Sequence, residues 1–206
     1  MIKAILFDFD NTLIDFMRYK RKCCEAAIDA MIAAGLKVSK KKATSVLFEL
    51  YGNLGIEYEK IFQKLLKKLT GKVDYRILTY GIGAYRKTKG KYLIPYSGTL
   101  ATLKKLKKKY KLAIISDAPR MQLWERLAAT GMDKLFSAVV SKSDVRIQKP
   151  SSKIFRKALK SLKIKPSEAL MVGDRVERDI AGAKALGIKC VFARYGNPEV
   201  KDSGAD

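Results

Sequence analysis

The sequence predicts an α/β protein in which a parallel β-sheet carries a separate, all-helical insertion after its first strand. Several short apolar segments show no polar alternation, which is typical of parallel strands buried on both faces. From residue 91 onward these segments alternate with amphipathic stretches of about 10–15 residues, as in repeated β-α-β units. Between residues 16 and 90 only helical periodicity occurs.

The first strand is expected at residues 2–7, a largely apolar stretch that leads into Asp8 and Asp10. Two carboxylates this close repel one another unless a cation lies between them or one of them holds a proton. The carboxyl end of a parallel strand is also where open α/β sheets bind ligands. We therefore expect a metal site or a reaction centre at this point.

Residues 16–90 are expected to form a unit of four helices joined by short connections. Apolar residues recur there at three- and four-residue steps, and glycines follow three of the segments as helix ends. Ser39 is the candidate N-cap of the second helix. The predicted domains are therefore a sheet domain (1–15 and 91–206) and a helical domain (16–90). The four helices are expected at residues 16–34, 39–52, 56–71 and 74–89.

Strands and helices alternate in the remainder of the chain, which favours a parallel sheet with right-handed crossovers. The polar tail, residues 197–206, has no periodicity and is expected to be frayed. Strands are expected at residues 112–115, 138–140, 169–172 and 188–192, and helices at 97–110, 120–130, 152–163 and from about 177.

Charge is the unusual feature of the composition. The 206 residues include 43 Lys and Arg against 20 Asp and Glu, a formal net charge of +23. Such a charge attracts anionic ligands and is also seen in nucleic-acid-binding proteins. A lysine-rich surface without a dedicated partner is the explanation we favour over nucleic-acid binding. The chain has no histidine, which excludes His-based triads and leaves acid–base chemistry to carboxylates, Lys, Tyr or Cys.

Cysteine usage predicts a cytoplasmic protein, and hydropathy predicts no membrane partner. A monomer or a homodimer is expected. Cys23 and Cys24 are adjacent and Cys190 is distant, so no disulfide framework is expected. No apolar run approaches the length that a bilayer requires, and no signal peptide is expected before the first strand.

Polar side chains lie where several of the predicted strands end. Because the carboxyl ends of parallel strands meet at one edge of the sheet, these residues should converge there. Each has a simpler explanation when taken alone, since Ser and Lys are common in loops and Asp often caps a helix. The set consists of Asp8, Asp10, Ser116 and Asp174, and Lys149, in a loop after another strand, can reach the same edge.

This set suits phosphoryl transfer through a covalent carboxyl phosphate. Asp8 can attack phosphorus, and Asp10 can protonate the leaving oxygen and later accept a proton from water. Mg²⁺ held by Asp8 and Asp174 would offset the charge of a carboxylate that attacks an anionic phosphate. Ser116 and Lys149 can bind phosphoryl oxygens.

Four motifs resemble those of the haloacid dehalogenase-like hydrolase superfamily: Asp8-x-Asp10-x-Thr12, Ser116, Lys149-Pro150, and residues 173–179. The resemblance spans residue 1 to about residue 195. It implies a Rossmann-like three-layer αβα core, with residues 16–90 as a C1-type cap. Residues 84–92 and 122–125 are similar to an archaeal subgroup of small-molecule phosphatases that includes glyceraldehyde 3-phosphate phosphatases.

The resemblance also implies roles for individual residues. Asp8 would be the nucleophile and Asp10 the general acid/base. Mg²⁺ would be bound by Asp8, the backbone carbonyl of Asp10 and Asp174, with Asp179 orienting the site. Ser116, Asp117 and Lys149 would bind the substrate phosphate. The candidates for further substrate contact near the cap hinges are Phe16, Arg18, Tyr19, Arg86 and Lys87.

The second motif departs from the family pattern, because Ala118-Pro119 stands where a glycine is usual. We expect the phosphate-binding turn to be shaped differently for this reason.

The function predicted is a Mg²⁺-dependent phosphatase of a small phosphorylated metabolite. A phosphomutase of the same superfamily is an alternative, because it differs in how well its cap excludes water. Dehalogenases do not use the second aspartate, and receiver domains lack a helical insertion. A basic nucleic-acid-binding protein with a relict site is the alternative from another class.

Overall fold

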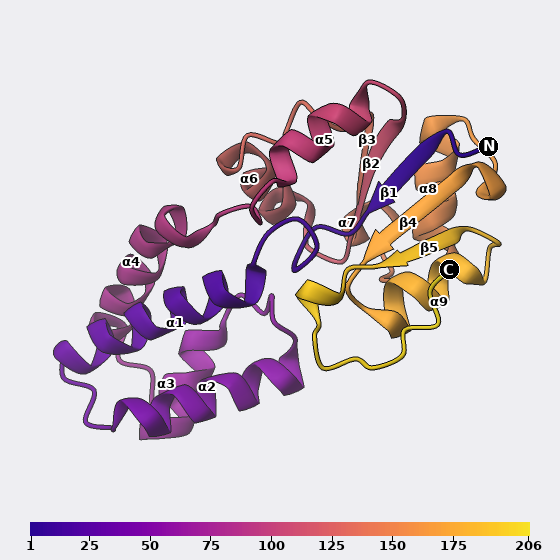
Figure 1. Ribbon diagram of the computed structural model, residues 1–206. Coiled ribbons are helices and arrows are strands. Elements are labelled where there is room, and N and C mark those ends of the chain that lie inside the picture. The colour runs from indigo at the N-terminus through magenta and orange to yellow at the C-terminus, as the bar shows by residue number, and fades with distance from the viewer. The chain divides into compact units, whose positions relative to one another are not determined.

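The computed structural model describes all 206 residues, and the chain divides into two compact units. One unit comprises Met1–Phe16 and Leu93–Asp206, and the other comprises Met17–Tyr92. The first is an α/β unit and the second is entirely helical (Figure 1). No helix of the chain combines the length and the apolar character needed to cross a membrane.

Five parallel strands form the sheet of the α/β unit, in the order β3-β2-β1-β4-β5. β1 is central and buried along its whole length, which explains its continuous apolar character. Phe7, its last residue, lies opposite Ile114 of β2 and Val172 of β4. The strands are β1 (Ala4–Phe7), β2 (Lys111–Ser116), β3 (Ala138–Ser141), β4 (Ala169–Gly173) and β5 (Lys189–Phe192).

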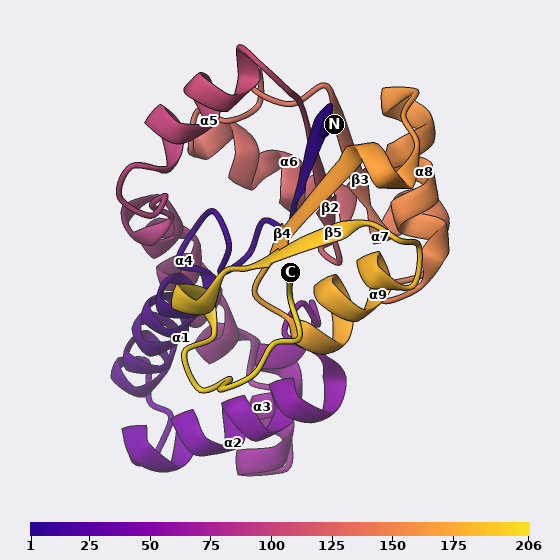
Figure 2. The same ribbon diagram turned by 45° about the vertical axis from the view of Figure 1, so that its right-hand side comes forward.

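Helices cover both faces of this sheet, which confirms the predicted three-layer αβα core. Helices α5 and α6 lie on one face and α8 and α9 on the other (Figures 1 and 2). Ile154 and Phe155 of α8 are fully buried against the apolar side chains of the sheet. The helices are α5 (Thr99–Lys107), α6 (Arg120–Ala129), α7 (Lys142–Val145), α8 (Ser152–Leu162) and α9 (Ala181–Lys184).

The helical unit packs its helices around one apolar core that includes Ile28, Met31, Leu47, Leu65 and Leu66. Its second helix is capped as predicted, because the Ser39 hydroxyl accepts a hydrogen bond from the backbone N–H of Lys42. The four helices are α1 (Phe16–Ala33), α2 (Lys40–Leu54), α3 (Ile61–Thr70) and α4 (Tyr75–Tyr92).

Two predicted helix boundaries in this unit are wrong. Helix α2 continues through Gly52 and ends at Leu54. The following residue, Gly55, has a φ of 91° that breaks the helix, while its N–H still bonds to the carbonyl of Tyr51. Helix α3 begins at Ile61 and not near residue 56. Ile56 and Tyr58 pack against the core from a turn, so their apolar spacing gave a false helical signal.

Three differences concern the α/β unit. The unpredicted α7 starts at Ser141, which forms a reciprocal capping box with Asp144. Residues Val176–Ile180, expected to begin an α-helix, form a π-helical turn before α9. The tail is not frayed at its end, because Asp206 exchanges backbone and side-chain hydrogen bonds with Cys190 at the edge strand β5. Short 3₁₀ turns occupy Pro166–Glu168 and Arg194–Gly196.

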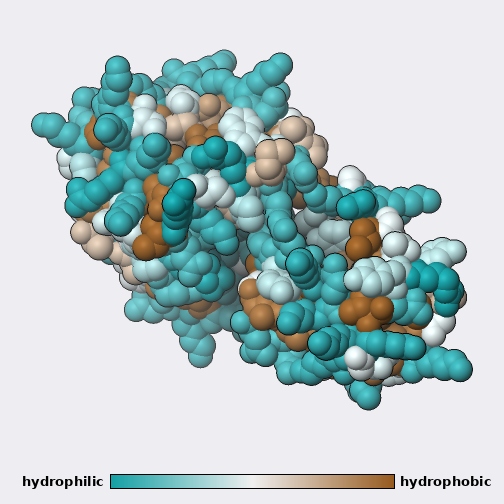
Figure 3. Space-filling model, turned by 180° about the vertical axis from the view of Figure 1, so that it is seen from behind, coloured by the Kyte–Doolittle hydropathy of each residue, from teal (hydrophilic) through white to brown (hydrophobic).

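Hydrophilic residues predominate on the face of the molecule shown in Figure 3, and its hydrophobic residues form small, separate groups. The lysines of α5 contribute to the hydrophilic surface, since Lys104, Lys105 and Lys107 are exposed. A lysine-rich surface without a dedicated partner stays the favoured explanation, and nucleic-acid binding the alternative.

Candidate active site

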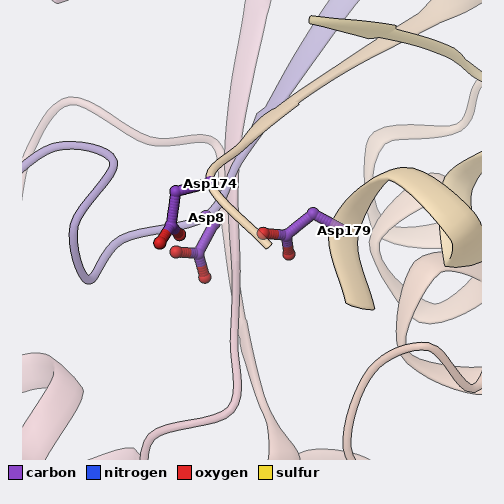
Figure 4. Close-up of side chains that lie close together, drawn as sticks. All are labelled: Asp8, Asp174 and Asp179. Atoms are coloured by element: carbon purple, nitrogen blue, oxygen red, sulfur yellow. The ribbon is translucent and has the colours of Figure 1, made fainter. Parts of the chain in front are cut away.

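Three buried aspartates, Asp8, Asp174 and Asp179, form a cluster at the carboxyl ends of the central strands. Their carboxylates point toward one another, and one oxygen from each lies within 4.8 Å of the others (Figure 4). Asp8 follows β1 and Asp174 follows β4. Because these two strands are hydrogen-bonded neighbours, residues far apart in the sequence become adjacent.

Asp179 enters the cluster from the π-helical turn that follows β4. The backbone N–H of Arg175 donates to Oδ2 of Asp179 over 3.0 Å, and the N–H of Asp179 donates to the Arg175 carbonyl over 2.7 Å. Gly173 makes room for this arrangement, because a Cβ at that position would lie 2.4 Å from Oδ2 of Asp179. Single π-helical turns occur often at functional sites, and this one turns the carboxylate back toward β4.

Lys149 lies between two of these carboxylates. Its Nζ is 2.5 Å from Oδ1 of Asp8, 2.6 Å from Oδ1 of Asp179 and 3.1 Å from the carbonyl oxygen of Ile115. The ammonium is buried, and burial alone would lower the pKa of Lys149, but the charges of Asp179 and Asp8 raise it above its usual value. Lys149 is therefore held as a cation.

The Lys149 loop is fixed by Asp117, which follows β2. Oδ1 of Asp117 accepts from the backbone N–H of Lys149 over 2.8 Å, and Oδ2 accepts from Nη1 of Arg178 over 3.1 Å. Both carboxylate oxygens thus serve contacts within the protein. A role of Asp117 in binding substrate stays a prediction.

The electrostatics of the cluster favour a cation. Burial, with the charges of Asp179, Asp174 and Asp10, raises the pKa of Asp8 well above its usual value, in spite of Lys149. Burial, followed by the charge of Asp179, raises the pKa of Asp174 to about 6. When all are ionised, the three carboxylates outnumber the one ammonium by two charges. An all-oxygen donor set with this excess charge fits Mg²⁺.

Two hydroxyl groups lie at the same edge of the sheet. Oγ1 of Thr12 is 3.4 Å from Oδ2 of Asp8 and 3.4 Å from Oδ1 of Asp174, so its one hydrogen serves either carboxylate in turn. Ser116 is the buried last residue of β2, and its Oγ accepts from the backbone N–H of Ala118 over 3.1 Å. The Ser116 hydroxyl can still donate its own hydrogen to a ligand.

The turn after Ser116 forms without the glycine of the family pattern. None of residues 116–119 adopts a positive φ. Ala118 is buried, and Pro119, with φ of −58°, immediately precedes α6. Because the turn contains no residue in the left-handed region, Ala118-Pro119 can stand where a glycine is usual.

Asp10 lies on the loop after β1 and is paired with Arg126 of α6. Nη1 of Arg126 is 2.9 Å from Oδ1 and 2.7 Å from Oδ2 of Asp10. No sequence pattern predicted this pairing. The signal that could have indicated it is a charged residue on an otherwise apolar helix face, since Leu123 and Leu127 flank Arg126 there and are fully buried.

The structure thus brings together Asp8, Asp174, Asp179 and Lys149, with Ser116 at the end of the neighbouring strand. The predicted substrate-contact residues differ in exposure. Phe16 and Tyr19 are buried, whereas Arg18, Arg86 and Lys87 are exposed. Their roles stay predictions.

A turn near the C-terminus also contacts the site, which no sequence pattern predicted. The hydroxyl of Tyr195 donates to the carbonyl of Thr12 over 2.7 Å, and Nδ2 of Asn197 donates to the carbonyl of Asp174 over 3.3 Å. The polar segment that holds these residues shows no periodicity, so no sequence signal pointed to them.

Comparison with known proteins agrees with this geometry. Residues 5–193 match the family model described as haloacid dehalogenase-like hydrolase. The chain is 38% identical over 196 residues to the glyceraldehyde 3-phosphate phosphatase of Pyrococcus furiosus, covering 95% of this chain and 82% of the relative. It is 36% identical over 189 residues to the enzyme of the same name from Methanocaldococcus jannaschii, covering 91% of this chain and 83% of that relative.

Among solved structures, the chain is similar to the HAD phosphatase from Thermococcus onnurineus. The TM-score is 0.67 and the sequence identity 26%, with 93% of this chain and 86% of the other covered. The chain therefore belongs to the haloacid dehalogenase-like hydrolase family, and within that family it is a phosphatase.

Proposed function

We propose that this phosphatase hydrolyses a small phosphorylated metabolite through a covalent aspartyl phosphate on Asp8, with Mg²⁺ as cofactor. The observation that carries the proposal is the buried Lys149 ammonium, held 2.5 Å from Asp8 inside a cluster of carboxylates. A nucleophilic carboxylate has to be ionised and oriented. Lys149 opposes the rise that burial causes in the pKa of Asp8, and its contact orients the carboxylate.

In the first half-reaction, a carboxylate oxygen of Asp8 attacks phosphorus and the bond from phosphorus to the ester oxygen breaks. Asp10 gives its proton to the departing oxygen. In the second half-reaction, water attacks phosphorus and transfers a proton to Asp10, and the bond from phosphorus to Asp8 breaks. Inorganic phosphate leaves, and both aspartates return to their starting states.

The other residues of the cluster bind Mg²⁺ or phosphoryl oxygens and neutralise charge. Asp8, Asp174 and the backbone carbonyl of Asp10 would hold Mg²⁺, and when bound the ion supplies the positive charge that lets a carboxylate approach an anionic phosphate. The Ser116 hydroxyl and the Lys149 ammonium would bind phosphoryl oxygens. Asp179 holds the Lys149 ammonium in place, since its Oδ1 lies 2.6 Å from Nζ of Lys149.

The mechanism is tested with p-nitrophenyl phosphate in Mg²⁺ and in EDTA. We expect turnover in Mg²⁺, its loss in EDTA and its return when Mg²⁺ is restored. Asp8→Asn should be inactive, because an amide is no nucleophile at phosphorus. Asp29→Asn, the same change at an exposed aspartate on α1, is the matched control and should keep full activity. Full activity of Asp8→Asn, or indifference to EDTA, would contradict the mechanism.

The substrate is proposed from the relatives. Because the relatives described above are named glyceraldehyde 3-phosphate phosphatases, this three-carbon ester is the first member of a panel of phosphorylated metabolites to test. A kcat/KM for glyceraldehyde 3-phosphate no higher than the panel average would contradict this choice.

We further propose that residues 16–90 act as a cap that selects the substrate. Basic side chains suit an anionic ester, and Arg18, Arg86 and Lys87 are exposed cations of this segment. If Arg86 or Lys87 contacts substrate, its replacement by Ala should raise KM for the preferred metabolite more than KM for p-nitrophenyl phosphate. Equal changes in the two KM values would contradict a role in selection.

A further inference from the structure

We infer that Arg126 is a positioning residue for Asp10, the proposed general acid/base. The inference rests on the proposed function and adds to it a residue outside the four motifs. Arg126 is far from Asp10 in the sequence, on the second half of α6, and the fold places its guanidinium against the Asp10 carboxylate.

The contact is a close ion pair that engages the whole carboxylate. Nη1 of Arg126 lies 2.9 Å from one oxygen of Asp10 and 2.7 Å from the other. The Arg126 side chain is 4% exposed, whereas that of Asp10 is 21% exposed. Asp10 therefore remains accessible to a ligand while Arg126 does not. An effect of Arg126 on the reaction would be transmitted through Asp10.

The guanidinium is itself fixed on several sides. The guanidinium carbon Cζ of Arg126 lies 4.5 Å from the ring centroid of Phe16, which is a cation–π contact. Its Nη2 donates to Oε1 of Gln122, one turn earlier on α6, over 3.4 Å. Leu123 and Leu127, on either side of Arg126, are fully buried and anchor the helix face. Arg126 is thus a rigid support and not a flexible surface cation.

Asp10 needs such a support because it lies in a loop and not in a strand. It lies beyond the last residue of β1, in a loop where isolated bridges join Asp10 to Ile14 and Ile14 to Pro95. A general acid has to lie within hydrogen-bond reach of the leaving oxygen, and a small displacement of a reacting group costs a large factor in rate. The Arg126 contact limits the positions that the Asp10 carboxylate can adopt.

The competing explanation is that Asp10 only neutralises a buried arginine. The two explanations differ in their dependence on the leaving group. An ester whose leaving oxygen is strongly basic needs the proton from Asp10, whereas p-nitrophenolate departs without one. Misplacing Asp10 should therefore harm an alkyl phosphate more than p-nitrophenyl phosphate.

The test uses the full chain with Mg²⁺ and measures kcat/KM for glycerol 2-phosphate and for p-nitrophenyl phosphate. For Arg126→Met we expect a loss of about tenfold or more on the alkyl ester and less than about threefold on p-nitrophenyl phosphate, since general acid catalysis contributes about 10²–10⁴. Arg126→Lys, which keeps the charge, should recover part of the loss. The ratio of the two kcat/KM values is independent of the fraction of each variant that is folded.

Two controls complete the design. Arg156→Met removes an exposed arginine of α8 and should leave the ratio unchanged. In the Asp10→Asn background, Arg126→Met should cause no further loss on the alkyl ester, because a residue that acts through Asp10 has nothing left to position.

Equal losses on both esters, no loss on either, or a full additional loss in the Asp10→Asn background would overturn the role of Arg126 and leave the proposed function intact. A wild-type chain that turns over neither ester would overturn the proposed function, and the role of Arg126 with it.

Discussion

The Nζ of Lys149 lies 2.5 Å from Oδ1 of Asp8, although the two residues are 141 positions apart in the sequence. The same ammonium contacts Asp179, and Asp179 is held in turn by the backbone of Arg175. The loop after α7, the end of β1 and the turn after β4 are thereby joined at one cation. Changes to any of these three segments should affect the others.

Replacing Lys149 by Met should abolish most of the activity without weakening Mg²⁺ binding. The variant loses the cation that orients Asp8, and removing one preorganised electrostatic group costs about 10²–10³ in kcat. The substitution also removes a positive charge that repels Mg²⁺, so the remaining carboxylates should attract the ion more strongly. Steady-state kinetics and the Mg²⁺ dependence of Tm measure the two effects. Lys153→Met, at an exposed lysine of α8, is the control, and weaker Mg²⁺ binding by Lys149→Met would contradict this account.

The stabilisation by Mg²⁺ should increase with pH. Burial and then Asp179 raise the pKa of Asp174 to about 6 without metal, from an ordinary value of 3.8. A carboxyl group whose pKa is raised by folding stabilises the folded state while protonated, and this contribution is lost as pH rises through that range. Mg²⁺ binds the deprotonated form, so it competes with protons.

We therefore expect the Mg²⁺-induced rise in Tm, measured against EDTA, to be small near about pH 5 and larger near about pH 7.5. Asp174→Asn should reduce the rise at both values, because it removes a proposed ligand. A rise in Tm that is independent of pH in the unsubstituted chain would refute the link to these carboxylates.

Gly173→Ala should displace Asp179. The new Cβ would lie 2.4 Å from Oδ2 and 2.5 Å from Cβ of Asp179, so rotation of the carboxylate alone cannot relieve the clash. We expect a loss of about 1–3 kcal/mol in the free energy of unfolding and weaker activity. Gly83→Ala is the matched control in α4, where a Cβ meets no atom within 4 Å and should stabilise the helix by up to about 1 kcal/mol. Chemical denaturation distinguishes the two, and equal stability changes would contradict the prediction.

Gly196→Ala should disturb the loop of the first motif from the C-terminal side. A Cβ at Gly196 would lie 2.0 Å from the backbone oxygen of Asn11 and 2.9 Å from Cβ of Asp174. Either the turn at residues 194–196 or the loop next to Asp10 has to move, and we expect about a tenfold loss in kcat/KM. Gly52→Ala, with no atom within 4 Å in α2, is the control and should be fully active. Unchanged kinetics of Gly196→Ala would show that the tail does not support the site.

Much of the fold followed from sequence patterns because strands and capped helices are local features. The continuous apolar run before Asp8 predicted a strand buried on both faces, and β1 is buried throughout. Ser39 is the predicted N-cap of the second helix, and its hydroxyl accepts from the backbone N–H of Lys42. The patterns failed where apolar spacing arose outside a helix, as at Ile56, or where the turn type depended on distant contacts.

The π-helical turn after β4 illustrates the second kind of failure. Residues 176–180 have ordinary helical composition, and nothing local distinguishes a π-turn from an α-helix there. Asp179 in that turn is held by a backbone hydrogen bond and by Lys149, which comes from another segment of the chain. Only the packing of the three segments selects the wider turn.

The sequence by itself determined the order along the chain of most strands and helices, because secondary structure depends on neighbours along the chain. It also determined which polar residue types lie at the strand ends. Parallel pairing then implied that Asp8 and Asp174 would share one edge. The tertiary structure alone decided which groups contact one another: that Lys149 joins Asp8 to Asp179, that Arg126 supports Asp10, and that the turn at Tyr195 reaches the loop at Thr12. These contacts join residues far apart in sequence, and their distances depend on how whole layers pack, which no local pattern encodes.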